Sequence, residues 1–199
     1  QMGLDILDDF CFDNVRRNLD RAGALGIFVR VDMEGSAYTE RTLNLVRRWH
    51  ETYPHVGTVI QSYLYRSEKD IEELNRRKIR VRLCKGAYKE PKEVAFPSKD
   101  EVNAHYRKLA DLLLRDGTSP ALATHDGAMI AAAMEAAAKH GRKKEEFEFQ
   151  MLYGVNRKGQ RDLTAQGYRT RVYVPFGTHW LPYFSRRIRE RKENFFFIL

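Results

Sequence analysis

Six segments with the pattern of a buried strand alternate with segments of helical periodicity, and this alternation limits what the chain can fold into. The strand-like segments are rich in β-branched residues and end in turns with glycine, proline or polar residues. Between them, apolar residues recur three and four positions apart. Such alternation is typical of a parallel sheet covered by helices. The predicted strands are 26–32, 56–61, 79–84, 120–123, 147–152 and 170–174. The predicted helices are 7–23, 38–52, 67–77, 98–114, 127–139, 156–166 and 180–192.

The residues that follow the strands distinguish two architectures. A doubly wound sheet binds its ligand at one switch point, whereas a (β/α)8 barrel directs every carboxyl end of a strand toward one site. All six predicted strands end in polar or glycine-containing segments, which favours an α/β fold of the TIM-barrel type. Six strands are too few to close eight. Either the chain lacks the first strands of such a barrel, or further strands are present without a recognisable pattern. In both cases residues 1–199 are expected to form one domain. The strand ends are Asp32, Gln61, 82–88, 124–125, 152–154 and 173–177.

Composition and charge exclude several classes of protein. The 35 basic and 27 acidic residues give a net charge of +8, spread over helices in the manner of solvated surfaces. A nucleic-acid-binding module stays an alternative, and it predicts a steeply salt-dependent affinity. Cys11 and Cys84 lie at no metal-ligand spacing, and His125 has no second histidine near it, so no metal site is expected. A reducing compartment fits so few cysteines. No run of about 18 apolar residues predicts a spanning helix.

The end of the third predicted strand has the most informative chemistry. Gly86 would let backbone N–H groups approach an anionic ligand, and Lys85 would add charge. An ordinary βα turn explains this dipeptide equally well when it is taken alone. Arg82 lies further inside the strand, where a buried guanidinium needs an anionic partner. Asp32 and Glu34 are either helix-capping acids or site residues that face these cations if their strands are neighbours.

The last predicted helix contains a second candidate site. Arg186 and Arg187 lie four and three residues before Glu190, so the three side chains can meet near one face. A salt-bridged solvent helix is one interpretation, and composition alone favours it. The other is an amino-acid clamp in which two guanidinium groups hold a carboxylate and Glu190 accepts from the amino nitrogen. The chain has no G-x-G-x-x-G motif, so a dinucleotide bound in the Rossmann manner is not supported.

Taken in order, these segments resemble the catalytic domain of proline dehydrogenase, the FAD-dependent (β/α)8 barrel, in its monofunctional bacterial form. The resemblance covers essentially all 199 residues. Each segment alone is a weak signal, but the ordered set at successive strand ends is specific. The segments are 31–34, 59–63, 82–88, 123–125, 149–154, 173–178 and 183–190.

The resemblance implies that FAD lies across the carboxyl ends of the strands. The implied reaction is oxidation of L-proline to Δ1-pyrroline-5-carboxylate by hydride transfer to flavin N5, the first step of proline degradation to glutamate. Arg82 beside N5 and Asp32 supporting the site are the implied catalytic residues. The implied FAD contacts are Met33, Gln61, Arg82, Lys85, Gly86, Ala87, Thr124 and His125. The implied substrate contacts are Arg186, Arg187, Glu190, Tyr173, Tyr183 and Leu152.

The resemblance also implies a quinone as electron acceptor, which a cytoplasmic protein would reach by peripheral contact with the inner membrane face. In the family, a lysine on an early strand binds the proline carboxylate, and it would fall just before Gln1. The resemblance thus implies that residues 1–199 are a single catalytic domain that lacks the first strand of the barrel and most of the second. We therefore expect these residues to belong to a longer chain and to bind FAD poorly alone; a normal flavin spectrum would contradict this. The alternative enzyme is a phosphate-binding β/α barrel without flavin, which predicts no yellow chromophore.

Overall fold

The computed structural model describes residues 2–177, and its centre is one six-stranded parallel sheet. The strand order is β1-β2-β3-β4-β5-β6, and each strand runs parallel to its neighbours. The strands are β1 Val29–Val31, β2 Val56–Gln61, β3 Arg80–Cys84, β4 Ala121–Ala123, β5 Glu148–Leu152 and β6 Arg169–Tyr173. The helices are α1 Asp8–Ala24, α2 Ser36–His50, α3 Ser67–Arg76, α4 Lys99–Asp116, α5 Gly127–Lys139 and α6 Arg157–Ala165, with a 3-10 turn η1 Lys144–Glu146.

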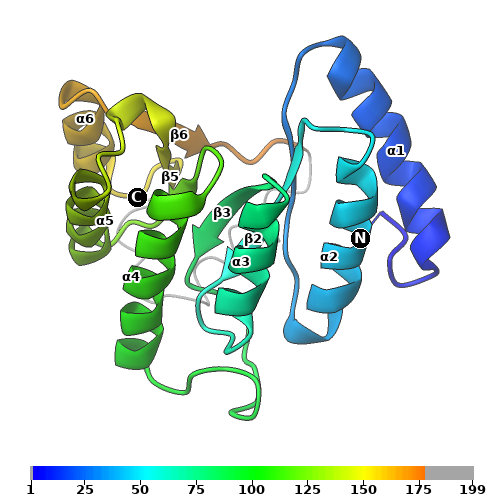
Figure 1. The fold of residues 1–199 in the computed structure, drawn as a ribbon, viewed down its shortest axis with the longest axis horizontal. Helices are drawn as coiled ribbons and strands as arrows, with labels where there is room; N and C mark the ends of the chain where they lie inside the picture. The colour runs from blue at the N-terminus through cyan, green and yellow to red at the C-terminus, as the bar shows by residue number, and fades with distance from the viewer. Residues whose placement is uncertain (1, 178–199) are drawn as a thin grey trace.

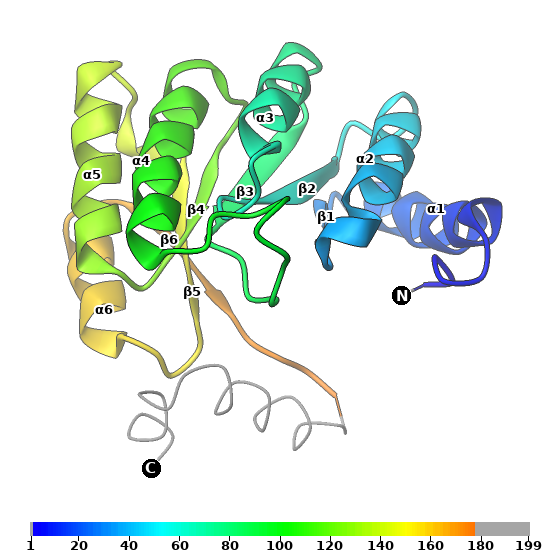
Figure 2. The same cartoon turned by 90° about the horizontal axis from the view of Figure 1, so that it is seen from below.

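The sequential strand order is that of a β/α barrel. A doubly wound sheet reverses its order at a switch point and has helices on both faces. Here the order never reverses, and α2 to α6 form an arc along the outer side of the curved sheet (Figures 1 and 2). Among the described residues β1 pairs only with β2, and β6 only with β5, so the sheet stays open. The fold is therefore part of a barrel, as predicted, and the position of any further strands stays a prediction.

Strands β3 and β5 show how the two faces of the sheet differ. In β3, Val81 and Leu83 are buried against the helices, while the intervening Arg82 is only half-buried. In β5, Phe149 and Met151 belong to the same hydrophobic core. Because side chains alternate along a strand, charged and polar residues line the concave face while apolar residues pack under the helices. The concave face is therefore built for polar contacts.

Local signals placed most element boundaries correctly. The predicted capping box of α4 is present, because the Ser98 hydroxyl accepts from the Glu101 N–H and the Glu101 carboxylate accepts from the Ser98 N–H, both at 3.2 Å. Strand β1 is shorter than the predicted 26–32, because its pairing with β2 begins only where Val29 meets Val56. The predicted helix 180–192 lies outside the described residues. Among the helices that the structure describes, none has the length and apolar composition of a membrane span.

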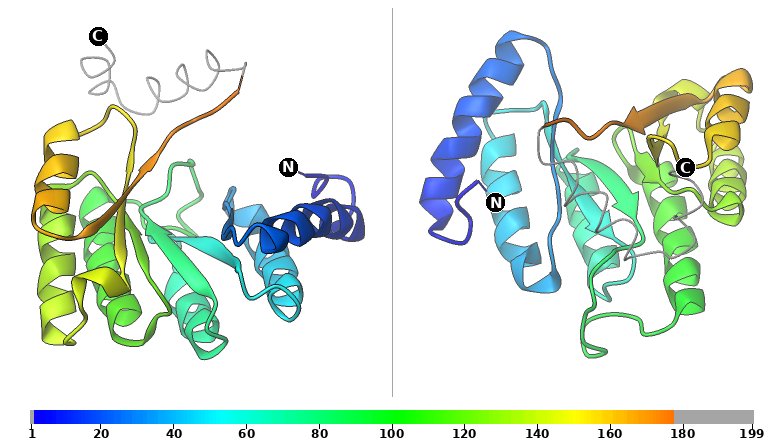
Figure 3. Two further views of the ribbon diagram at one scale, coloured as in Figure 1. Left: turned by 90° about the horizontal axis from the view of Figure 1, so that it is seen from above. Right: turned by 180° about the vertical axis from the view of Figure 1, so that it is seen from behind.

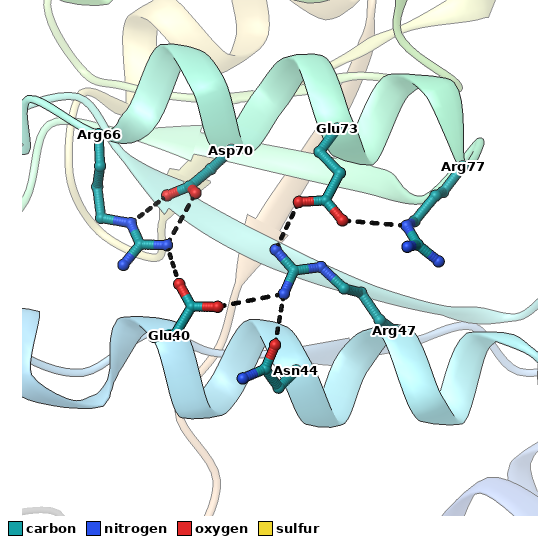
Figure 4. A network of polar contacts seen from close by, with 7 residues as sticks. All are labelled: Glu40, Asn44, Arg47, Arg66, Asp70, Glu73 and Arg77. Atoms are coloured by element: carbon teal, nitrogen blue, oxygen red, sulfur yellow. Dashed lines mark hydrogen bonds and ion pairs between the residues drawn. The ribbon is translucent and has the colours of Figure 1, made fainter.

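An ion-pair network joins α2 to α3 on the outer surface (Figure 4). Arg47, with a side chain 14% exposed, donates to Glu73 at 2.8 Å and lies 3.4 Å from Glu40. Arg66 also contacts Glu40 and pairs with Asp70 at 2.7 Å. Seen from behind, α1 and α2 lie at one end of the molecule and α5 and α6 at the other (Figure 3). The network thus links α2 to α3 through side chains on the outside of the sheet.

Candidate active site

Arg82 and Asp32 form an ion pair across the concave face of the sheet. The Arg82 Nη2 atom donates to Asp32 Oδ1 at 2.6 Å, with side chains 18% and 60% exposed. The predicted anionic partner of Arg82 is therefore found. The strands β1 and β3 are not neighbours, because β2 lies between them. Two strands separated by a third lie about 10 Å apart. The arginine is long enough to span that distance over Val59, its register partner in β2.

Lys85 pairs with an acid that the sequence analysis did not connect to it. Its Nζ lies 2.7 Å from Asp126 Oδ2, and the other carboxylate oxygen of Asp126 caps α5 by accepting from the Ala128 N–H at 3.0 Å. The hydrogen bond from Lys85 holds the pKa of Asp126 below its ordinary value. Glu34, the acid considered for Lys85, instead accepts from the Tyr88 hydroxyl. The Lys85 charge is therefore already balanced within the site.

Gly86 is required by the packing of Tyr63 beneath it. The residue has φ +107°, and a Cβ atom there would lie 2.2 Å from the Tyr63 ring. An L residue fits neither the backbone conformation nor the space. The opposite side of the turn is open, because Gly86 and Ala87 are both exposed. The backbone N–H of Gly86 is directed at the Cys84 sulfur, and contact of this turn with a ligand stays a prediction.

Two buried polar atoms of the concave face have no hydrogen-bond partner among the described residues. One is Oε1 of Gln61, a side chain only 4% exposed at the end of β2, and the other is Nε of Arg82. Buried polar atoms in folded proteins are nearly always hydrogen-bonded, so each unpaired one needs an explanation. A free acceptor and a free donor on adjacent strands suit a ring that presents both groups at its edge. The isoalloxazine of a flavin is such a ring, so these residues fit FAD.

The fourth strand end holds Thr124 and His125 through backbone contacts. Thr124 accepts from the Asp126 N–H at 3.1 Å, and His125 Nε2 accepts from the Leu152 N–H at 2.8 Å. Nε2 of His125 therefore acts as an acceptor, whereas a buried histidine more commonly donates to a backbone carbonyl. Strand β4 ends at Ala123, which leaves the Leu152 N–H of β5 in need of an acceptor. His125 supplies one, and the accepting nitrogen carries no proton.

The remaining predicted contacts divide into three groups. Leu152 and Tyr173 are register partners at the ends of β5 and β6, so they lie side by side. The Met33 side chain is buried in the hydrophobic core, and its N–H donates to Asp32 at 3.0 Å. Four predicted substrate contacts lie outside the described residues: Tyr183, Arg186, Arg187 and Glu190.

The concave face also contains a pair of arginines stacked on a phenylalanine ring, which the sequence analysis missed. The guanidinium carbons of Arg30 and Arg80 lie over the Phe28 ring, 5.0 and 4.9 Å from its centroid. Gly57 makes room for it, since a Cβ there would lie 2.7 Å from the ring. Burial, followed by the nearby charge of Arg82, lowers the pKa of Arg30 to about 10. A glycine inside a buried strand was the available signal, because it often marks a close approach.

These features define a β/α-barrel protein with charged and polar side chains gathered at the carboxyl ends of its strands, the end at which such barrels bind their ligands. A family model described as proline dehydrogenase matches residues 4–198. The chain belongs to the proline dehydrogenase family, as the ordered motifs predicted. That family is FAD-dependent.

Curated relatives and solved structures agree with this assignment. The chain is 43% identical over 196 residues to proline dehydrogenase 2 of Bacillus subtilis strain 168, covering 98% of this chain and 65% of that protein. It is 42% identical over 194 residues to a proline dehydrogenase of Deinococcus radiodurans, covering 96% and 63%. The chain thus spans about two thirds of the length of these relatives. A crystal structure of proline utilization A from Bdellovibrio bacteriovorus, inactivated by N-propargylglycine, matches with TM-score 0.85 and 30% identity over 91% of this chain and 22% of that one.

Proposed function

We propose that this chain forms the catalytic barrel of an FAD-dependent proline dehydrogenase that oxidises L-proline to Δ1-pyrroline-5-carboxylate. The observation that carries the proposal is the unpaired acceptor of Gln61 beside the unpaired donor of Arg82, both buried on the concave face. Buried polar atoms are usually paired, and a bound ring that pairs with both of these would account for them. The relatives named proline dehydrogenase support the choice of substrate.

Bound FAD supplies the two-electron oxidant that side chains lack. Arg82 would donate from Nε to the flavin edge, and its charge would stabilise negative charge that develops there. Asp32, 2.6 Å from the same guanidinium, fixes its orientation. Gln61 would accept from a ring N–H, and the exposed backbone of Gly86 and Ala87 would approach the cofactor from the next turn.

The substrate side of the proposal depends on β5, β6 and the C-terminal segment. Leu152 and Tyr173 would pack around the proline ring, since they lie side by side at the open end of the sheet. Arg186 and Arg187 would hold the carboxylate, and Glu190 would face the nitrogen. In the overall reaction the ring carbon beside the nitrogen loses a hydride and the nitrogen a proton, which leaves a C=N bond.

An absorbance spectrum of the full-length polypeptide encoded by the gene, recorded without oxygen before and after L-proline, tests this function. We expect a flavin spectrum that bleaches with L-proline. A matched Gln61→Leu variant should bind FAD more weakly, because leucine fills a similar volume but cannot accept a hydrogen bond. No flavin after reconstitution with FAD, or no bleaching, would refute the proposal and favour the phosphate-binding barrel.

A quinone as acceptor, a cytoplasmic location and peripheral contact with a membrane remain predictions. Their support is the family resemblance and the net charge of +8, which suits an anionic lipid surface. Sedimentation with vesicles that contain anionic lipid, at low and high salt, tests the membrane contact. Reduction of a soluble quinone analogue by the proline-reduced protein tests the acceptor.

A further inference from the structure

Glu90 caps a helix that belongs to a different part of the chain. It lies in the loop between β3 and α4, and its Oε1 accepts from the Ser36 N–H, the first of α2, at 2.7 Å. The Ser36 hydroxyl donates to its other carboxylate oxygen. The N-cap position of α2 is Gly35, which has no side chain to satisfy the helix. The carboxylate of Glu90, 54 residues further along the chain, accepts the helix N–H that an N-cap side chain would otherwise bind.

The electrostatics of this contact favour an ionised carboxylate. The amino-terminal end of a helix carries partial positive charge, which attracts an anion. Burial raises the pKa of Glu90, but hydrogen bonds from Ser36 and Tyr63 outweigh it and hold the pKa below its ordinary value. The Tyr63 hydroxyl donates to Oε1 at 3.2 Å. Glu90 is thus a charged acceptor for three donors from two separate segments.

Tyr63 connects this contact to the flavin-facing turn. Its ring lies directly beneath Gly86, and its N–H donates to the Lys85 carbonyl at 3.0 Å. On the other side, Ser36 lies only four residues after Asp32, where the turn after β1 leads into α2. The carboxylate therefore bonds to residues that lie next to two sides of the proposed site, the turn after β1 and the turn after β3.

We propose that Glu90 is a positioning residue that fastens the β3–α4 loop to the start of α2 and so holds these two sides of the flavin site together. The effect on FAD rests on the proposed function, whereas the effect on the two loops does not. A residue that served stability alone would weaken the fold without a separate effect on cofactor affinity.

Hydrogen exchange of the full-length protein without FAD tests the fastening directly. Glu90→Ala should raise exchange about tenfold in residues 85–98 and in the first turn of α2, as expected for the loss of one or two hydrogen bonds to a charged group. Glu90→Gln should have a smaller effect, because an amide oxygen still accepts from the Ser36 N–H. Glu93→Gln is the matched control, since Glu93 is an exposed acid of the same loop. Unchanged exchange in Glu90→Ala would overturn the proposal.

Titration with FAD, followed by flavin fluorescence, tests the consequence for the site. We expect Glu90→Ala to weaken FAD binding about tenfold. Gly141→Ala, a destabilising change beyond the end of α5, should leave the affinity unchanged. Equal weakening in both variants would show that only stability is involved, and would overturn the positioning role. If the unsubstituted protein binds no FAD, the proposed function fails together with the flavin half of this proposal, while hydrogen exchange still decides whether Glu90 joins the loops.

Discussion

Replacement of Gly86 by alanine tests the packing beneath the turn after β3. The new methyl group would lie 2.2 Å from Cδ1 and 2.3 Å from Cε1 of Tyr63, well inside contact distance. The ring cannot easily move, because it is 7% exposed and its hydroxyl bonds to Glu90. The backbone would also have to accept φ +107° with a side chain present. Both effects destabilise the folded state.

The two costs can be estimated separately. Left-handed backbone costs an L residue roughly 1–2 kcal/mol. Forcing extra volume into a packed region costs about 1–3 kcal/mol. We therefore expect Gly86→Ala to lower the free energy of unfolding by roughly 2–5 kcal/mol. Because the proposed FAD site includes this turn, FAD affinity should fall as well.

Urea unfolding at neutral pH measures the first effect, and two controls separate its causes. Gly141→Ala has φ +62° and no atom within 4 Å of the added carbon, so it should cost only the backbone part. In a Tyr63→Ala background the clash disappears, and Gly86→Ala should then cost no more than Gly141→Ala. Equal losses for the two glycine variants in the unsubstituted protein would refute the packing argument. So would a Gly86→Ala cost that stays as large in the Tyr63→Ala background as in the unsubstituted protein.

Three further predictions concern stability. Arg47→Met should cost about 1–3 kcal/mol by urea unfolding, because the Arg47 side chain is only 14% exposed and its hydrogen bonds to Glu73 and Asn44 are lost. Arg77→Met, at a side chain 48% exposed, should cost less than about 0.5 kcal/mol; similar losses would contradict the ranking. Burial raises the pKa of Glu148, but its arginine and glutamine partners outweigh this and lower it overall. A carboxylate whose pKa is lower in the folded than in the unfolded state stabilises the protein at pH values above its unfolded pKa of about 4.3. This stabilisation is lost as the pH falls through the folded pKa. Glu148→Gln should therefore lose less stability than the parent protein between about pH 5 and 3, and the exposed Glu135→Gln should behave like the parent. Ser98→Ala should lower the free energy of unfolding by about 1 kcal/mol, because it removes the capping box of α4; no change would show that the cap adds nothing.

Much of the fold follows from local signals, since strand and helix periodicity reports on burial within a few residues. All six predicted strands are present, and β2 spans 56–61 as predicted. The alternation in β3 placed Arg82 on the inner face, and the physical cost of burying a charge then required an acid near it. Asp32 is that acid.

Other contacts depend on how distant turns meet, and no local pattern encodes them. The pairing of Lys85 with Asp126 joins residues 41 apart, and it exists because β3 and β4 are neighbours with their carboxyl ends at one edge. His125 became an acceptor because β4 stops short of β5. Glu90 accepts a hydrogen bond from Ser36 because the loop after β3 passes close to the start of α2.

The elements, the polar strand ends and the family could all be predicted from the amino-acid sequence, because each depends on residue type and short-range spacing. Which charges neutralise each other, and which polar atoms stay unpaired, became known only from the packed sheet. Hydrogen bonds and ion pairs act over a few ångströms, and strand order and register set those distances. Gln61 shows the difference, since its sequence position placed it at a strand end and only the packed sheet showed its amide oxygen buried without a donor.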